Sequence, residues 1–209
     1  MIKNIIFDLD GTIIESAPGI LNGFSYVLEK MRKAYDINDL KKYIGPPLRD
    51  SFVKELGEDR ADEAVVLYRI YYGKKGVYEA KVYDGICKLI KDLYDNDFKI
   101  YLATSKIKKP SLEVLRYFDL LKYFTYVEGS NETLDNKKKV IQSVIDNNKL
   151  KKDKSIMIGD RSYDIEAGFA LGLKTMGVSY GYGDISEFKK ADYIAKSPQD
   201  IWQIIKKIN

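Results

Sequence analysis

The sequence predicts an α/β fold: a doubly wound, Rossmann-like parallel sheet with an all-α cap domain inserted into it. Short apolar runs alternate with helical patterns along most of the chain, which is typical of βαβ units and a parallel sheet. The segment after the first apolar run carries helical patterns only. Carboxylates, hydroxyls and glycine turns follow the apolar runs, where open α/β sheets bind their ligands.

The predicted strands are short apolar runs bounded by turn signals. The first, residues 4–7, ends at two carboxylates, Asp8 and Asp10, and then at Gly11 and Thr12. An unpaired buried charge is costly, so these carboxylates are expected at the carboxyl edge of the sheet rather than in its core. The remaining strands are expected over residues 98–103, 126–128, 155–158, 174–178 and 193–195.

The predicted core helices span residues 84–96, 110–118, 137–147 and 165–171, and Ser197 caps a final one. Cys87 is expected to pack on the core face of the first of these helices. Within the insert, Ser16 is expected as the N-cap of a helix, Asn38 as the N-cap of a helix over residues 38–43, and two more helices over 48–56 and 58–72.

The two kinds of pattern define two domains. Residues 1–14 and 83–209 form the predicted α/β core, and residues 15–82 form the helical cap. No strand is expected between residues 14 and 83. The crossings at residues 13–17 and 78–84 are candidate hinges.

The composition of the 209-residue chain excludes several kinds of function. Its 35 basic and 31 acidic residues are interspersed, so no basic arm indicates nucleic-acid binding. We expect a cytoplasmic protein without a membrane segment, because a secretory signal, a run of about 20 apolar residues and a second cysteine are absent. The absence of histidine excludes Ser-His-Asp, Cys-His and histidine–zinc sites. Acid–base chemistry must then use Asp, Glu, Lys or Tyr.

Polar residues that follow several predicted strands are expected to meet at one edge of the sheet. Three or more carboxylates at one place repel each other unless a cation lies among them. Oxygen ligands without histidine or thiolate favour Mg²⁺. A lysine and a hydroxyl beside the metal would accommodate a phosphate. The residues expected to converge are Asp8, Asp10, Thr104, Ser105, Lys137, Asp160 and Asp164.

Four of these segments resemble, in order, the four motifs of the haloacid dehalogenase superfamily. They are D-L-D-G-T from Asp8, Thr104 after a strand, Lys137 at the start of a helix, and G-D-R-S-Y-D from Gly159. The insert resembles the helical cap of the phosphoglycolate phosphatase-like branch. The segments Y-I-G-P-P-L-R-D-S-F (43–52) and V-S-Y-G-Y-G (178–183) are similar to segments of that branch.

The resemblance implies a role for each catalytic residue. Asp8 would be the nucleophile that forms an aspartyl-phosphate, and Asp10 would protonate the leaving oxygen and then accept a proton from water. Thr104, Ser105 and Lys137 would bind the phosphoryl oxygens.

The resemblance also implies a metal site and a substrate contact. Asp8, Asp160 and the backbone carbonyl of Asp10 would hold Mg²⁺. Asp164 would position the active-site lysine or a metal-bound water, and Arg49 of the cap could reach the anionic end of the substrate.

Some of these residues have purely structural alternatives. Thr104 could be only a helix N-cap, Arg49 a surface charge, and Asp164 a structural cap or ion-pair partner.

Others remain open for local reasons. Lys138 and Lys139 are rivals of Lys137, which is preferred because its spacing to the following apolar pair matches similar sequences. Tyr180 and Tyr182 are interpreted as loop packing rather than as substrate contacts.

The function implied is a Mg²⁺-dependent phosphatase, monomeric or homodimeric, acting on a small phosphorylated metabolite. The favoured substrates are phosphoglycolate-like, and the alternative function is that of a 5'-nucleotidase. Similar phosphosugar mutases use a cap histidine that is absent here, and dehalogenases lack an aspartate at the position of Asp10. A non-enzymatic receiver domain, which also gathers Asp, Thr and Lys around Mg²⁺, has no cap insert. Glu15 departs from the aspartate usual in related sequences, which leaves the hinge contact there open.

Overall fold

The computed structural model describes residues 1–209 and divides into two compact units. The core unit comprises Met1–Glu15 and Val82–Asn209, and the cap unit is Ser16–Lys81. None of the helices is both long enough and apolar enough to cross a bilayer.

The core unit contains the main sheet and five helices. The six strands of this sheet are β1 (Asn4–Phe7), β4 (Lys99–Ile107), β5 (Phe124–Ser130), β6 (Ser155–Gly159), β7 (Lys174–Val178) and β8 (Tyr193–Ala195). The five helices are α5 (Ile86–Asp95), α6 (Lys108–Tyr117), α7 (Lys137–Asn148), α8 (Ser162–Ala170) and α9 (Pro198–Lys207).

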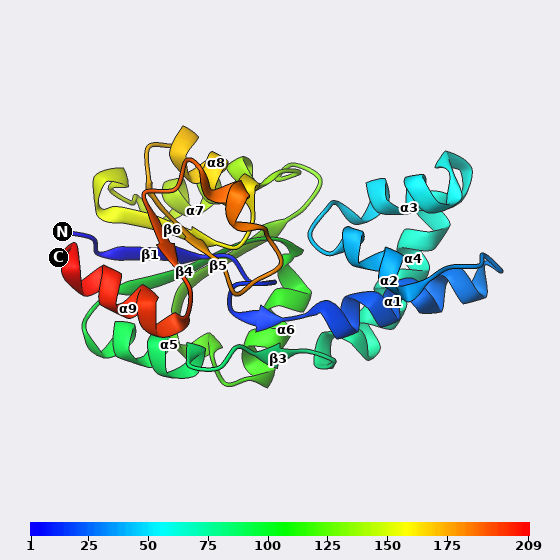
Figure 1. Cartoon of the computed structure of the whole chain (residues 1–209), viewed down its shortest axis with the longest axis horizontal. Helices are drawn as coiled ribbons and strands as arrows, with labels where there is room; N and C mark the ends of the chain where they lie inside the picture. The colour runs from blue at the N-terminus through cyan, green and yellow to red at the C-terminus, as the bar shows by residue number, and fades with distance from the viewer. The chain divides into compact units, whose positions relative to one another are not determined.

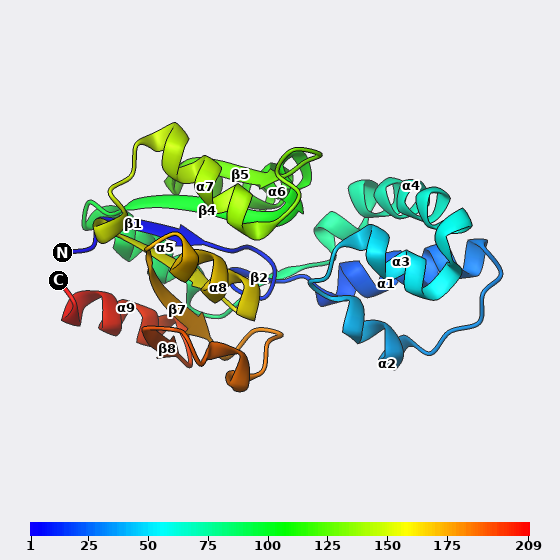
Figure 2. The ribbon, with the colours of Figure 1, turned by 90° about the horizontal axis from the view of Figure 1, so that it is seen from above.

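The strands are ordered β5-β4-β1-β6-β7-β8, and every neighbouring pair is parallel (Figure 2). Helices α7 and α8 cover one face of the sheet, while α5, α6 and α9 cover the other (Figure 1). The predicted doubly wound fold is therefore confirmed. Because the chain winds outward in both directions from the centre, the carboxyl ends of β1 and β6 lie at a topological switch point, where such sheets bind ligands.

Helix α7 is held to the sheet by apolar packing. Its buried Val140, Ile141 and Val144 belong to one cluster with Ile6 of β1 and Met157 of β6. These apolar positions recur at helical spacing, so one face of α7 is buried while the other stays polar. The packing fixes the first residue of α7, Lys137, over the centre of the sheet.

The cap unit is helical and has its own aromatic core. Its helices are α1 (Ala17–Lys30), α2 (Ile37–Leu40), α3 (Leu48–Leu56) and α4 (Glu58–Lys74). The ring of Phe24 lies 4.6 Å from that of Phe52 and 5.4 Å from those of Tyr43 and Tyr68, between centroids. Aromatic side chains bury large apolar areas, so this cluster gives the insert a core without a sheet.

Several predicted boundaries in the cap were wrong. Asp36, not Asn38, caps the second helix, because the Asp36 carboxylate accepts the N–H of Asn38. The predicted start of α1 is confirmed, since Ser16 is its N-cap residue, although the Ser16 side chain makes no capping hydrogen bond. Helix α4 continues through Gly73 to Lys74, since glycine only lowers helix propensity. Two-residue strands, β2 (Ile14–Glu15) and β3 (Lys81–Val82), pair at the boundaries of the insert, where no strand was expected.

Two predictions for the core unit also need correction. Strand β4 does not stop at Ala103 but continues to Ile107, because its backbone pairs with β5 at Thr104 and, after a register shift, again at Ile107. Cys87 is exposed rather than buried, since the core face of α5 is formed by Ile86, Leu89, Ile90 and Leu93.

Candidate active site

The register of the central strands brings the acidic motifs together. Phe7 of β1 is aligned with Ile158 of β6, and the Asp8 N–H donates to the Ile158 carbonyl at 2.9 Å. Asp8 follows the first strand by one residue and Asp160 follows Ile158 by two. Both carboxylates therefore emerge from the same carboxyl edge.

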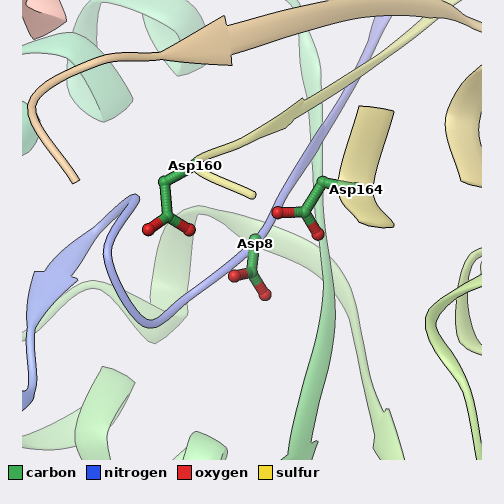
Figure 3. A group of neighbouring side chains, drawn as sticks. All are labelled: Asp8, Asp160 and Asp164. Carbon is green, nitrogen blue, oxygen red and sulfur yellow. The ribbon is translucent and has the colours of Figure 1, made fainter. Parts of the chain in front are cut away.

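Three buried carboxylates, those of Asp8, Asp160 and Asp164, form the centre of the site. Each offers one oxygen within 4.8 Å of the others, and Figure 3 shows the three side chains as one group of neighbours. Asp164 lies in the first turn of α8, where a carboxylate is favoured by the helix dipole. All three residues are at most 5% exposed.

Lys137 supplies a positive charge within this acidic cluster. Its Nζ lies 2.6 Å from Asp8 Oδ1 and 2.8 Å from Asp164 Oδ1, and it donates to the Ala103 carbonyl at 2.9 Å. Burial lowers the pKa of Lys137, but the charges of Asp164 and Asp8 outweigh it, and the net effect raises that pKa above its usual value. The side chain of Lys137 is therefore held in its charged ammonium form.

The rival lysines lie elsewhere. Lys138 is exposed, and Lys139 forms an ion pair with Asp135 at 3.0 Å on the surface. The structure therefore brings Lys137, and neither neighbour, to the carboxylates.

The buried carboxylates are electrostatically strained. Burial raises the pKa of Asp8 to about 7, because the attraction of Lys137 only partly offsets desolvation and the negative charge of Asp164 adds to it. Burial and the charges of Asp164 and Asp8 raise the pKa of Asp160 to about 8. A cation among these oxygens would stabilise their ionised forms.

Asp160 has one oxygen free to bind such a cation. Its Oδ2 accepts the N–H of Tyr182 at 2.8 Å, whereas its Oδ1 is buried and has no hydrogen-bond partner. An unpartnered buried carboxylate oxygen is expensive unless a ligand satisfies it. The oxygen-only donor set fits a hard divalent cation such as Mg²⁺.

Asp10 is paired with a residue that the sequence analysis missed. Lys106 Nζ lies 2.7 Å from Asp10 Oδ1, and the two side chains are 11% and 18% exposed. Lys106 lies between Thr104 and Ile107, where the register of β4 against β5 shifts, so the regular alternation of side chains along a strand does not hold there. The strand predicted from the sequence ended at Ala103, and Lys106 was therefore not considered.

Thr104 and Ser105 differ in their surroundings. Thr104 is buried within β4, and its Oγ1 accepts the Lys106 N–H at 3.2 Å. It does not cap α6, whose N-cap residue is Ile107. Ser105 is exposed, and its backbone carbonyl accepts a hydrogen bond from the Ser130 hydroxyl at 2.6 Å.

Asp164 combines the two roles considered for it. Oδ1 pairs with Lys137, while Oδ2 accepts the Arg161 N–H at 3.1 Å and thereby caps α8.

Arg49 has partners within the cap unit. Its Nε lies 2.8 Å from Asp62 Oδ1 and its guanidinium also lies 3.0 Å from Glu58 Oε2. These hydrogen bonds raise the pKa of Arg49 further. Its contact with a substrate stays a prediction.

Comparisons with known proteins agree with this arrangement. A family model for haloacid dehalogenase-like hydrolases matches residues 5–178. A 5'-nucleotidase of Pseudomonas aeruginosa is 35% identical over 191 residues, which cover 89% of this chain and 86% of that protein. Pyrophosphatase PpaX of Halalkalibacterium halodurans is 30% identical over 210 residues, covering 98% of this chain and 97% of that protein. The crystal structure of a predicted phosphatase from Clostridium acetobutylicum is similar, with a TM-score of 0.92, 37% identity and 99% coverage of both chains.

We expect Lys137→Met to destabilise the core unit, because it leaves Asp8 and Asp164 buried without their cation. Breaking a buried ion pair from one side costs about 3–5 kcal/mol. Urea unfolding in EDTA at pH 7, followed by the fluorescence of the single tryptophan, Trp202 of α9, would measure the loss. The matched control is Lys138→Met, which should change the unfolding free energy little. Equal effects of the two substitutions would contradict the assignment of Lys137.

Proposed function

Because the chain belongs to the haloacid dehalogenase-like hydrolase family, we propose that it is a Mg²⁺-dependent phosphomonoesterase that acts through an aspartyl-phosphate. The family and the phosphatase class predicted from the sequence are confirmed. The observation that carries the finer proposal is the buried group of Asp8, Asp160 and Asp164 around the Lys137 ammonium. When all three carboxyl groups are ionised, the one ammonium leaves an excess of two negative charges, and the raised pKa values of Asp8 and Asp160 reflect the cost of that excess.

A divalent cation would neutralise the excess negative charge of the three ionised carboxylates. Asp8, Asp160 and the backbone carbonyl of Asp10 are the groups that would hold Mg²⁺, with the unpartnered Asp160 Oδ1 as one ligand. When bound, Mg²⁺ supplies positive charge that offsets the repulsion between an anionic nucleophile and a phosphate.

Asp8 is the proposed nucleophile. A carboxylate oxygen of Asp8 attacks phosphorus, the bond from phosphorus to the leaving oxygen breaks, and an aspartyl-phosphate forms. Asp10, which must enter this step as the carboxylic acid, donates its proton to the leaving oxygen, so that the product departs as an alcohol. Lys137 forms an ion pair with Asp8 at 2.6 Å, which fixes the orientation of the Asp8 carboxylate before attack.

Asp10 also serves in the second step. The deprotonated Asp10 accepts a proton from a water molecule that attacks phosphorus. The bond between phosphorus and Asp8 then breaks, which releases inorganic phosphate and regenerates both carboxyl groups. Thr104, Ser105 and Lys137 are the proposed contacts of the phosphoryl oxygens in both steps.

Lys106 is proposed as a further residue of this machinery. Its ion pair with Asp10 Oδ1, largely shielded from solvent, holds the side chain of the proposed acid–base in place. Its ammonium also adds positive charge at the edge of the sheet where an anionic substrate would bind.

The proposed substrate is a small phosphomonoester of the phosphoglycolate type. A nucleoside 5'-monophosphate is the second candidate, which the likeness to the Pseudomonas aeruginosa 5'-nucleotidase favours.

A substrate panel tests this proposal. Purified protein is incubated with phosphoglycolate, nucleoside 5'-monophosphates or pyrophosphate, and released phosphate is measured with Mg²⁺ or with EDTA. We expect Mg²⁺-dependent hydrolysis of a phosphomonoester. Hydrolysis of pyrophosphate alone would contradict the substrate class, and full activity in EDTA would contradict the metal dependence.

The substitution Asp8→Asn should abolish turnover of p-nitrophenyl phosphate, because an amide cannot act as the attacking carboxylate. The variant should remain folded by circular dichroism, since asparagine has nearly the same shape. Hydrolysis at the wild-type rate would show that Asp8 is not the nucleophile.

The substitution Lys106→Met should lower kcat by about tenfold or more, because Asp10 loses the partner that orients it and general acid–base help is typically worth about 10²–10⁴-fold. The loss of unfolding free energy should stay below the about 3–5 kcal/mol that breaking a fully buried ion pair costs, because both side chains keep part of their surface exposed. Lys109→Met, at an exposed neighbouring position, is the control. An unchanged kcat for Lys106→Met would remove Lys106 from the machinery.

A further inference from the structure

The loop of residues 179–183, which follows β7, holds the carboxylate of Asp160. The backbone N–H of Tyr182 donates to Asp160 Oδ2 at 2.8 Å. Asp160 Oδ1, fully buried, is left without a hydrogen-bond partner. The loop therefore engages one oxygen of this carboxylate and leaves the other for a ligand.

Two glycines pack against the same carboxylate. A Cβ at Gly181 would lie 2.3 Å from the Gly11 carbonyl oxygen and 2.4 Å from Asp160 Cβ. A Cβ at Gly11, whose φ is +81°, would lie 2.1 Å from Asp160 Oδ2. Contacts this short do not occur with real side chains, so Asp160 is held between two stretches of backbone that only glycine allows. The φ of Gly181 lies outside the left-handed region, and its constraint is one of space alone.

Tyr180 ties the loop to the turn that carries the nucleophile. Its hydroxyl donates to the Thr12 carbonyl at 2.8 Å. Its ring packs edge-on against Tyr83, with 5.0 Å between centroids. Because Thr12 closes the D-G-T turn after Asp10, the 179–183 loop contacts both segments that supply the acidic residues.

We propose that the 179–183 loop is a positioning element for Asp160, which keeps Oδ1 turned toward the cation site and thereby sets the affinity for a divalent cation. The inference rests on the proposed function, since it concerns the same metal site. Groups that orient a metal ligand are typically worth 10–100-fold in metal affinity. The loop acts on Asp160 through a backbone N–H and through close packing, so its contribution does not depend on a side chain reaching the metal.

The test is the binding of Mg²⁺ to chelator-treated protein, measured by isothermal titration calorimetry. The substitution Gly181→Ala should displace Asp160 and raise the Kd for Mg²⁺ by about tenfold or more. The control is Gly73→Ala in α4, where an added Cβ meets nothing within 4 Å, and its Kd should equal that of the wild type. Melting of each variant in EDTA is recorded alongside.

The two readouts separate positioning from mere support of the fold. A Gly181→Ala protein that melts earlier in EDTA but binds Mg²⁺ with the wild-type Kd would overturn the inference. If Gly181→Ala does not fold, the Kd of Tyr180→Phe for Mg²⁺ tests the inference instead, because this substitution removes only the hydroxyl that donates to the Thr12 carbonyl. A Kd raised several-fold then supports the inference, and an unchanged Kd overturns it. A wild-type protein that binds no Mg²⁺ would instead overturn the proposed function and the inference with it.

Discussion

The rest of the site depends on one electrostatic constraint: three buried carboxylates share a single buried ammonium. The charge of Lys137 cannot balance Asp8, Asp160 and Asp164 together, which is why burial and mutual repulsion raise the pKa values of Asp8 and Asp160. A protein gains nothing in stability from such a group, because replacing buried charges with apolar residues is often neutral or stabilising. The arrangement therefore makes physical sense as a binding site for a cation and an anion together.

The strand order of the sheet brings these charged residues together. Strand β1 lies at the centre of the sheet, with β4 on one side and β6 on the other, so side chains at three adjacent strand ends meet at one edge. Helices α7 and α8 pack against each other on the same face. Their first turns carry Lys137 and Asp164, and the packing of the two helices sets the 2.8 Å ion pair between those residues. The apolar interior of the core unit thus determines the geometry of its polar edge.

The strands and the acidic residues could be predicted from the sequence because each has a local signature, an apolar run followed by a carboxylate. Lys106 could not, since its place depends on β4 continuing along β5 through polar residues, and that continuation comes from backbone pairing rather than from side-chain pattern. Tyr182 donates to Asp160 through its backbone N–H, which every residue except proline has, so the residue type at position 182 does not reveal this contact. Cys87 was misplaced because neighbouring residues on a helix point about 100° apart, and Ile86 takes the buried position.

The cap unit contains no acidic cluster of this kind, and its ion pairs join Lys42 to Glu55 and Arg49 to Glu58 and Asp62. Arg49, the predicted substrate contact of the cap unit, is one of these paired residues. Its guanidinium is matched by Glu58 and Asp62, and both partners are exposed to solvent. Exposed ion pairs contribute little to stability, so exchanging these carboxylates for an anionic group of a substrate would cost little. The pairs seen in the free protein therefore do not argue against Arg49 as a substrate contact. The proposed chemistry depends on the buried charges of the core unit, whereas Arg49 is held only by exposed carboxylates of the cap unit.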